Sequence, residues 1–146
     1  SIEDPLKYFS GVYVASRKVM EWAHKMGATS MVATSTAAVY GDSIDVPLKE
    51  NSKLEPMSPY AMFKLEMDHL LRNYNKTNYK QTMDIYNVGS GIETQVIEVA
   101  KALTSKIVYM AKRNEPHRSC ADISLIKNNL NWNPETNLLS WVKQIK

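Results

Sequence analysis

Two residues of one predicted helix have types and a spacing suited to proton transfer. Tyr60 and Lys64 are four positions apart, and residues four apart on a helix lie on the same face. A free tyrosine titrates at about 10, so proton exchange near neutral pH requires its phenolate to be stabilised by roughly 3 units, or about 4 kcal/mol. A neighbouring lysine cation can supply part of that free energy. We therefore expect Tyr60 and Lys64 to reach the same ligand.

Hydroxyl groups that would complete such a site lie upstream, in the run Ser35-Thr36-Ala37-Ala38-Val39-Tyr40-Gly41. Small and β-branched residues that end in Tyr-Gly predict a buried strand with hydroxyls at its carboxyl end. Ser58 is a preferred helix N-cap and Pro59 suits the first helical position, so the helix that carries Tyr60 should begin there. A hydroxyl at the strand end would hydrogen-bond the tyrosine oxygen and the substrate oxygen, fixing the geometry of proton transfer.

Taken together, these residues resemble the extended short-chain dehydrogenase/reductases, and most of all the nucleotide-sugar 4-epimerases. A Tyr-x-x-x-Lys pair alone is weak support, whereas its combination with the upstream strand is specific. The motif residues are Thr36 in Ser-Thr-Ala-Ala-Val-Tyr-Gly-Asp, Pro47, Glu50, Ser58-Pro59 and Tyr60-x-x-x-Lys64. Dehydratases of the family usually have Asp-Glu where Ala37-Ala38 stand, so the sequence resembles the epimerase or reductase branch instead.

The resemblance implies a role for each residue of the motif. Tyr60 would move a proton while a hydride passes to and from NAD, and Thr36 would position the reacting oxygen. Lys64 would hold the nicotinamide ribose together with Tyr60 and lower the pKa of the tyrosine. Ser35 and Thr36 would contact the substrate, which is a nucleotide-sugar in this family.

Two further substrate contacts are implied in the carboxyl-terminal part. Asn87 lies in a Tyr-Asn-x-Gly-x-Gly segment that belongs to the substrate side of the family fold. Arg118 lies in a stretch, 116–134, that resembles the family's carboxyl-terminal signature, where an arginine contacts the nucleotide diphosphate. A planar guanidinium suits that contact. The alternative for Arg118 is a solvated loop cation, and the Gly-x-Gly after Asn87 is expected to be structural because a third glycine is missing.

The sequence also departs from the family pattern. It contains no G-x-x-G-x-x-G turn for the NAD pyrophosphate, although such a turn begins the family fold. The stretch of sequence between Lys64 and Asn87 contains fewer residues than the corresponding stretch in family members. We therefore expect the back half of an epimerase with an internal deletion, either degenerate or dependent on a separate NAD-binding chain. The alternative is a non-catalytic module that binds nucleotide-sugars or assembles as a dimer.

Composition and charge exclude other classes of protein. With 146 residues, 44% hydrophobic and 23% charged, the sequence predicts a single domain over 1–146. A net charge of +3 with interspersed signs argues against a nucleic-acid partner. A lone Cys120 and the lack of a signal peptide or an apolar run of about 20 residues favour a cytoplasmic protein without a membrane span. No residue spacing predicts a metal site.

Periodicity predicts a truncated Rossmann-like α/β fold, with a short, mostly parallel sheet flanked by helices. Gly27 should end the first helix in a left-handed cap, and Thr94 should cap the third. The segment 42–57 is either an ordinary polar connection or a functional lid. The predicted helices are 5–26, 59–74 and 94–103. The predicted strands are 29–40 with its lead-in, a strand followed by a glycine turn within 84–91, and 107–110.

Helix 5–26 is apolar on more than one side, so it needs two packing partners. In the resembled family this helix and the tyrosine helix form a four-helix dimer interface. The resemblance therefore implies a homodimer through helices 5–26 and 59–74. The alternative is a monomer in which the second apolar face meets the carboxyl-terminal segment of the same chain.

Overall fold

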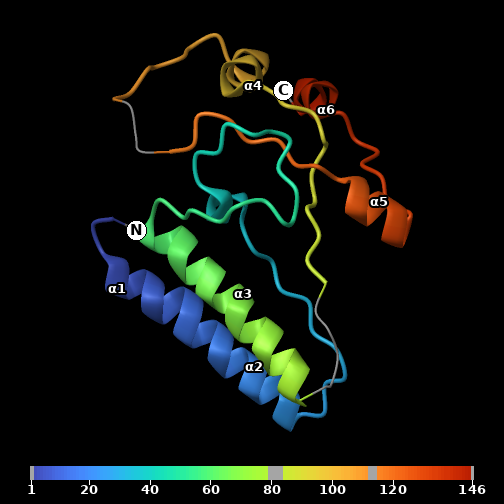
Figure 1. Cartoon of the computed structure of the whole chain (residues 1–146). Coiled ribbons are helices and arrows are strands. Elements are labelled where there is room, and N and C mark those ends of the chain that lie inside the picture. Colours follow the sequence, from blue (N-terminus) through green and yellow to red (C-terminus); the bar gives the residue numbers. More distant parts are fainter. Residues whose placement is uncertain (1, 79–83, 112–114, 146) are drawn as a thin grey trace. The chain divides into compact units, whose positions relative to one another are not determined.

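The computed structural model describes residues 2–78, 84–111 and 115–145. These residues form two compact units (Figure 1). Unit 1 consists of Ser1–Asp42 and Lys53–Asp84, and unit 2 consists of Ser43–Ser52 and Ile85–Lys146. The predicted tyrosine and lysine lie in unit 1.

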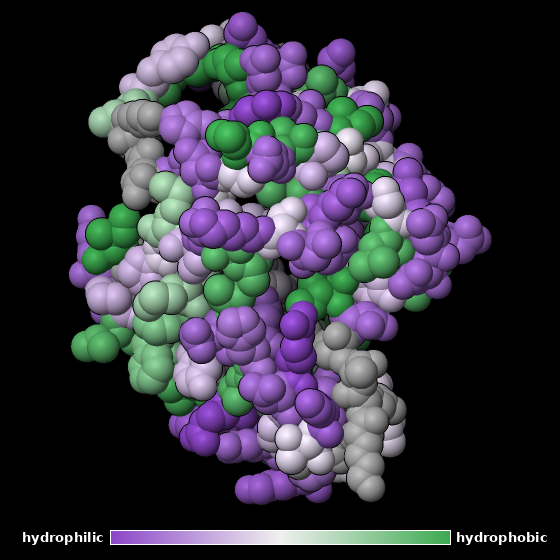
Figure 2. All heavy atoms as spheres, in the orientation of Figure 1, coloured by the Kyte–Doolittle hydropathy of each residue, from purple (hydrophilic) through white to green (hydrophobic). Residues whose placement is uncertain are grey.

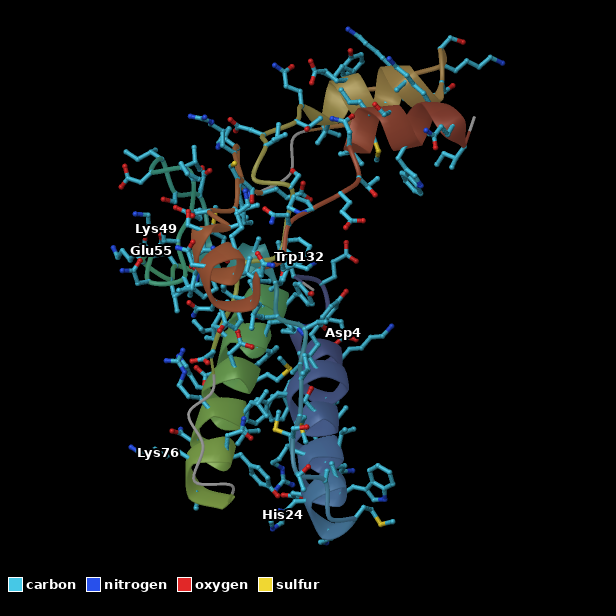
Figure 3. The ribbon with its side chains drawn as sticks, turned by 90° about the vertical axis from the view of Figure 1, so that its right-hand side faces the viewer. Asp4, His24, Lys49, Glu55, Lys76 and Trp132 are labelled. Carbon is cyan, nitrogen blue, oxygen red and sulfur yellow. The ribbon has the colours of Figure 1, made fainter. Side chains whose placement is uncertain are left out.

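Unit 1 is built on two helical rods that run side by side in the same direction (Figure 1). The first contains α1 (Pro5–Tyr8), the π-helical segment η1 (Phe9–Val14) and α2 (Ala15–Lys25), and the second is α3 (Pro59–Asn78). Rings pair along the contact in matching order, from Phe9 with Phe63 to His24 with Tyr74. In Figure 3, His24 and Lys76 accordingly lie toward the same end of the pair. The two helices predicted in this half of the chain are confirmed.

Both helix starts follow the expected capping chemistry. The Asp4 carboxylate accepts from the backbone N–H of Lys7, with Pro5 in the first turn. The Ser58 hydroxyl accepts from the backbone N–H of Ala61 at 3.2 Å, and Pro59 opens α3 as predicted. Gly27 has a φ of 79°, which matches the left-handed cap expected after α2.

The core of unit 1 lies between the two rods and the segment that follows α2. Met20 of α2 packs with Met67 and Leu71 of α3, and Leu71 is only 1% exposed. Met31 and Ala33 of the returning segment pack against the same cluster. This segment covers one side of the cluster, but Val32 within it is 96% exposed, so the segment is not buried throughout as predicted.

The returning segment is not a β-strand, and this corrects the prediction for 29–40. Residues 30–36 have no regular secondary structure, and Ala37–Tyr40 form the 3-10 helix η2. A strand exists only where a neighbouring strand accepts and donates its ladder hydrogen bonds. The other two predicted strands lie in unit 2, so the described residues of unit 1 provide no such neighbour.

Unit 2 contains α4 (Val96–Leu103), α5 (Ser124–Leu130) and α6 (Leu138–Gln144), with α4 packed against α6. The helix predicted from Thr94 is present, but its N-cap is Gln95. The Gln95 side chain and Glu98 form a reciprocal capping box, which satisfies two otherwise free backbone donors.

The predicted strands of unit 2 are also absent from the described residues. Residues 84–88 and 106–111 have no regular secondary structure. The one pairing of β type in the described ranges is an isolated parallel bridge between Leu48 and Ala121. It is made by the Leu48 N–H to the Cys120 carbonyl and the Asp122 N–H to the Leu48 carbonyl, both at 2.7 Å. The predicted sheet is therefore not formed in this part of the chain.

None of the helices in the described ranges is both long enough and apolar enough to cross a membrane.

Gly41 ends η2 in a conformation that suits glycine alone. Its φ and ψ are 68° and −149°, a region that residues with a side chain hardly adopt. A Cβ at this position would lie 2.1 Å from the Glu55 carbonyl oxygen. The Glu55 N–H in turn donates to the Val39 carbonyl at 3.0 Å. Backbone of the segment 53–57 thus closes over the end of the Tyr-Gly motif.

Replacement of Gly41 by alanine should therefore destabilise unit 1 strongly. Backbone in this sparsely populated region costs a residue with a side chain about 1–3 kcal/mol, and the overlap with a backbone carbonyl adds to that cost. Gly27→Ala is the matched control, because Gly27 has a φ of 79° but no atom within 4 Å of the added Cβ. Urea unfolding should show a clearly larger loss for Gly41→Ala than for Gly27→Ala, and equal losses would contradict the steric argument.

Candidate functional site

Tyr60 lies in the first turn of α3, where the Ser58 cap and Pro59 fix the start of the helix. Its side chain is half-buried, and its ring meets the ring of Tyr8 edge to face, with centroids 6.0 Å apart and an interplanar angle of 78°. Edge-to-face packing of this kind is a favoured aromatic geometry. The first helical rod therefore fixes the plane of the Tyr60 ring.

Lys64 follows one turn later on α3 and binds the segment that precedes η2. Its ammonium group donates a hydrogen bond to the backbone carbonyl of Thr34 and lies 3.9 Å from the sulfur of Met67. The structure thus binds the lysine to the residue directly before the run of hydroxyl residues. The contact is to backbone two residues before Thr36.

Ser35 and Thr36 use their hydroxyls within unit 1. The Ser35 hydroxyl donates to the carboxylate of Asp68 on α3. The Thr36 hydroxyl oxygen accepts from the backbone N–H of Ala38 at 3.3 Å and caps η2. An accepting oxygen of this kind keeps its own hydrogen for donation, so Thr36 retains the capacity to bind a substrate oxygen.

Asp68 was not anticipated from the sequence. It is a buried carboxylate, 8% exposed, and it stands four positions after Lys64 on the same face of α3. Burial raises its pKa above the ordinary range, while the Ser35 hydrogen bond and the Lys64, His69 and Arg72 cations partly oppose that rise. The i, i+4 spacing from Lys64 is the signal that would have identified it.

Asn87, a predicted substrate contact, joins three segments of unit 2. Its side-chain amide donates to the Leu48 carbonyl at 2.8 Å and to the Asp122 carbonyl at 3.4 Å. Its backbone N–H donates to the Glu50 carboxylate at 2.7 Å. These bonds give Asn87 and the motif residue Glu50 a structural function beside the Leu48–Ala121 bridge.

The glycines after Asn87 are packed tightly, which supports their structural interpretation. A Cβ on Gly91, whose φ is 68°, would lie 3.2 Å from the Ile123 side chain. A Cβ on Gly89 would lie 3.3 Å from the Cβ of Ala121. Glycine at both positions therefore lets the turn approach the 121–123 segment.

Arg118, the predicted diphosphate contact, is held by a carboxylate of its own unit. Its Nε and Nη2 atoms donate to the two oxygens of Glu93 at 2.8 Å and 2.7 Å. The hydrogen bonds lower the pKa of Glu93 and raise that of Arg118. Both side chains are exposed, so the pair contributes little to stability. Arg118 is thus neither buried nor simply solvated.

Another carboxylate of unit 2, that of Asp122, is held by a local turn. Hydrogen bonds from the side chain and backbone of Ser124 lower the pKa of Asp122, and the backbone bond measures 2.8 Å. Among the residues that the structure describes, no group of three His, Cys, Asp or Glu side chains is placed to hold a metal ion.

The predicted site residues therefore fall into two sets. Ser35, Thr36, Tyr60 and Lys64 lie in unit 1, where Lys64 and Asp68 connect α3 to residues 34 and 35. Asn87 and Arg118 lie in unit 2, each bound within that unit. The roles of all six in catalysis or ligand binding stay predictions.

Residues 1–113 match the family model of the NAD dependent epimerase/dehydratase family. Over 71 residues the chain is 37% identical to the UDP-glucose 4-epimerase of Lacticaseibacillus casei, a match that covers 49% of this chain and 22% of the relative. It is 34% identical over 76 residues to the bifunctional UDP-glucose 4-epimerase and UDP-xylose 4-epimerase 1 of Pisum sativum, covering 52% and 22%. The match thus spans about a fifth of the length of these curated relatives.

Two solved structures share the fold. A crystal structure of UDP-galactose 4-epimerase aligns with a TM-score of 0.81 at 16% identity, over 97% of this chain and 70% of that one. The UDP-N-acetylglucosamine 4-epimerase of Methanobrevibacter ruminantium M1, in complex with UDP-N-acetylmuramic acid, aligns at 0.82 with 17% identity, over 99% and 70%. At these identities the alignments establish the backbone arrangement of an epimerase, and no more.

The raised pKa of Asp68 predicts a pH-dependent effect of Asp68→Asn. A folded state with a raised carboxyl pKa binds more protons than the unfolded state, so this carboxylate's contribution to stability falls as the pH rises through its folded pKa. Asparagine does not titrate. Thermal unfolding should therefore show Asp68→Asn gaining stability relative to the unsubstituted protein as the pH rises above the ordinary carboxyl pKa of 3.8, and a constant difference would contradict the assigned shift.

Glu66→Gln is the matched control, because Glu66 is an exposed carboxylate of the same helix. The same pH trend in this variant would mean that removal of any negative charge from α3 suffices.

Proposed function

The chain belongs to the NAD dependent epimerase/dehydratase family, and from that membership we propose that it binds a nucleotide-sugar and is an epimerase-like protein. One observation carries the proposal: the helix that presents Tyr60 is bonded through Lys64 to the segment that ends in Thr36. Those are the three residue types that the sequence motif assigns to proton transfer. We infer further that the two units are parts of one epimerase-like domain.

In this proposal three side chains of unit 1 serve the reaction at one sugar hydroxyl. Tyr60 takes the hydroxyl proton and later returns it. Thr36 donates a hydrogen bond to the same oxygen and sets its position. Lys64 supplies the positive charge that favours the phenolate. Ser35, Asn87 and Arg118 are the further ligand contacts of the proposal.

The donors of unit 1 fit one end of an NAD cofactor. The Lys64 ammonium and the Tyr60 hydroxyl are donors suited to ribose hydroxyls, and both stand on the same helix. NAD in this family supplies the acceptance and return of a hydride. This sequence has no glycine-rich turn for a pyrophosphate, and a dinucleotide-binding segment outside it, such as a separate chain, belongs to the proposal. A cytoplasmic location does too, supported by the single Cys120.

A non-catalytic module that binds nucleotide-sugars is the second candidate. It is supported by the bonds that the predicted site residues already make inside the chain. Lys64 binds the Thr34 carbonyl, Thr36 caps η2 and Arg118 binds Glu93. A ligand site without redox chemistry is compatible with each of these contacts.

Calorimetry on the purified chain distinguishes these candidates, with a UDP-sugar, NAD or NADH as the titrant. We expect a UDP-sugar to bind. Turnover of the sugar supports the epimerase. Tyr60→Phe should lower that turnover at least about 100-fold because it removes the general acid–base group. Tyr109→Phe, at an exposed position of unit 2, is the control. Sugar binding without turnover, both in the purified chain and together with a dinucleotide-binding chain, supports the module, and no UDP-sugar binding would contradict both.

We infer in addition that the chain is a homodimer through the helices 5–26 and 59–74. The inference is supported by three exposed apolar residues at helical spacing, two within α2 and one at its carboxyl-terminal cap. They are Val19, Trp22 and Met26, which are 59%, 63% and 67% exposed. Figure 2 shows hydrophobic residues reaching the surface among hydrophilic ones, and apolar surface at a helix face favours association.

Sedimentation of the purified chain tests the dimer. The expected mass is twice that of one chain, and Trp22→Glu should shift the equilibrium to the monomer because it places a charge in an apolar interface. Val108→Glu, at an 86% exposed position outside both helices, is the control and should remain dimeric. A monomer at all concentrations of the unsubstituted chain would refute the inference.

A further inference from the structure

Asp68 is a buried carboxylate that has no part in the proposed proton transfer. It is 8% exposed, and among the described residues its carboxylate accepts a hydrogen bond from the Ser35 hydroxyl. Carboxylates are seldom buried unless they are paired or hydrogen-bonded, because the loss of hydration is unfavourable. The position of Asp68 therefore needs an explanation other than packing.

Two bonds one helical turn apart fasten the same short segment to α3. Lys64 binds the Thr34 carbonyl, and Asp68 accepts from the Ser35 hydroxyl. A single bond would leave the segment free to pivot about one point. Because the two bonds hold the neighbouring residues 34 and 35, they fix both the position and the direction of the chain as it enters Thr36.

Thr36 is the residue on which that constraint acts. Its backbone is extended, with φ −148° and ψ 143°, and the chain turns into η2 directly after it. The hydroxyl of Thr36 also caps that turn. A rotation of residues 34 and 35 would therefore move the threonine hydroxyl with respect to α3.

We propose that Asp68 is a positioning residue that holds Thr36 in place through Ser35, a role that rests on the proposed function of Thr36. The charges around Asp68 agree with this arrangement. Burial is the largest influence and raises its pKa, while the Ser35 hydrogen bond and the Lys64, His69 and Arg72 cations partly oppose that rise. A carboxylate accepts a stronger hydrogen bond than a neutral group, so the link to Ser35 is firm.

Four variants separate the hydrogen bond from the charge and the volume of the side chains. Asp68→Ala removes the acceptor and Ser35→Ala removes the donor. Asp68→Asn keeps an acceptor oxygen without the charge, and Ser35→Thr keeps the hydroxyl. Backbone hydrogen exchange over 34–40 and the NMR signals of the Thr36 methyl group report on the segment without any need for activity.

We expect exchange over 34–40 to accelerate roughly tenfold in both alanine variants, as for the loss of a hydrogen bond to a charged group. The double variant should be no faster than either single variant, because the two residues form one bond. Asp68→Asn and Ser35→Thr should restore the exchange rate and the Thr36 methyl shift. The proposal would be overturned if hydrogen exchange over 34–40 were unchanged in Ser35→Ala, or if neither conservative variant restored the original exchange rate. Equal acceleration of exchange along α3 would overturn it too.

Activity measurements then separate this proposal from the proposed function. If the chain turns over a UDP-sugar, Asp68→Ala should lower kcat about tenfold with KM nearly unchanged, and Asp68→Asn should recover most of kcat. An active chain with unaltered kcat in Asp68→Ala would overturn the positioning role. A chain that neither binds nor converts the sugar refutes the proposed function, and the exchange and NMR comparisons still decide whether Asp68 positions Thr36.

Discussion

Unit 1 depends on the burial of three side chains between its helical rods. Met20, Met67 and Leu71 pack together, and the segment after α2 covers them. Burying a side chain of this size contributes roughly 1.5–3 kcal/mol, whereas a typical hydrogen bond contributes about 0.5–1.5 kcal/mol net. Packing therefore holds α3 and the returning segment together. The polar bonds of Lys64 and Asp68 determine how that segment is oriented once it is there.

The helices were predictable because their signals are local. Ser58 and Pro59 mark the start of α3, and Gly27 marks the end of α2. Strand predictions failed for the opposite reason. The β-branched run before Tyr40 has the composition of a buried strand, and it is partly buried, but a strand also needs a neighbour with which to pair. Composition says nothing about whether that neighbour is present.

The candidate site shows the same division between local and long-range information. The family motif predicted Tyr60, Lys64 and Thr36, and the structure connects the lysine with the segment that carries the threonine. Asp68 escaped notice because a carboxylate on a helix is usually solvated, and only its burial beside Ser35 makes it unusual. Similarly, the sequence suggested a ligand contact at Asn87 but did not indicate its bonds to Leu48 and Asp122.

The bidentate pair of Arg118 and Glu93 has a consequence for anion recognition. Two parallel bonds to the carboxylate hold the guanidinium plane in one orientation before any ligand arrives. In the proposed function, the phosphate that Arg118 contacts offers a similar pair of oxygens and has to displace the Glu93 carboxylate. Glu93 would then act as an internal stand-in for the anion, and its release would make affinity depend on how readily that side chain yields its place.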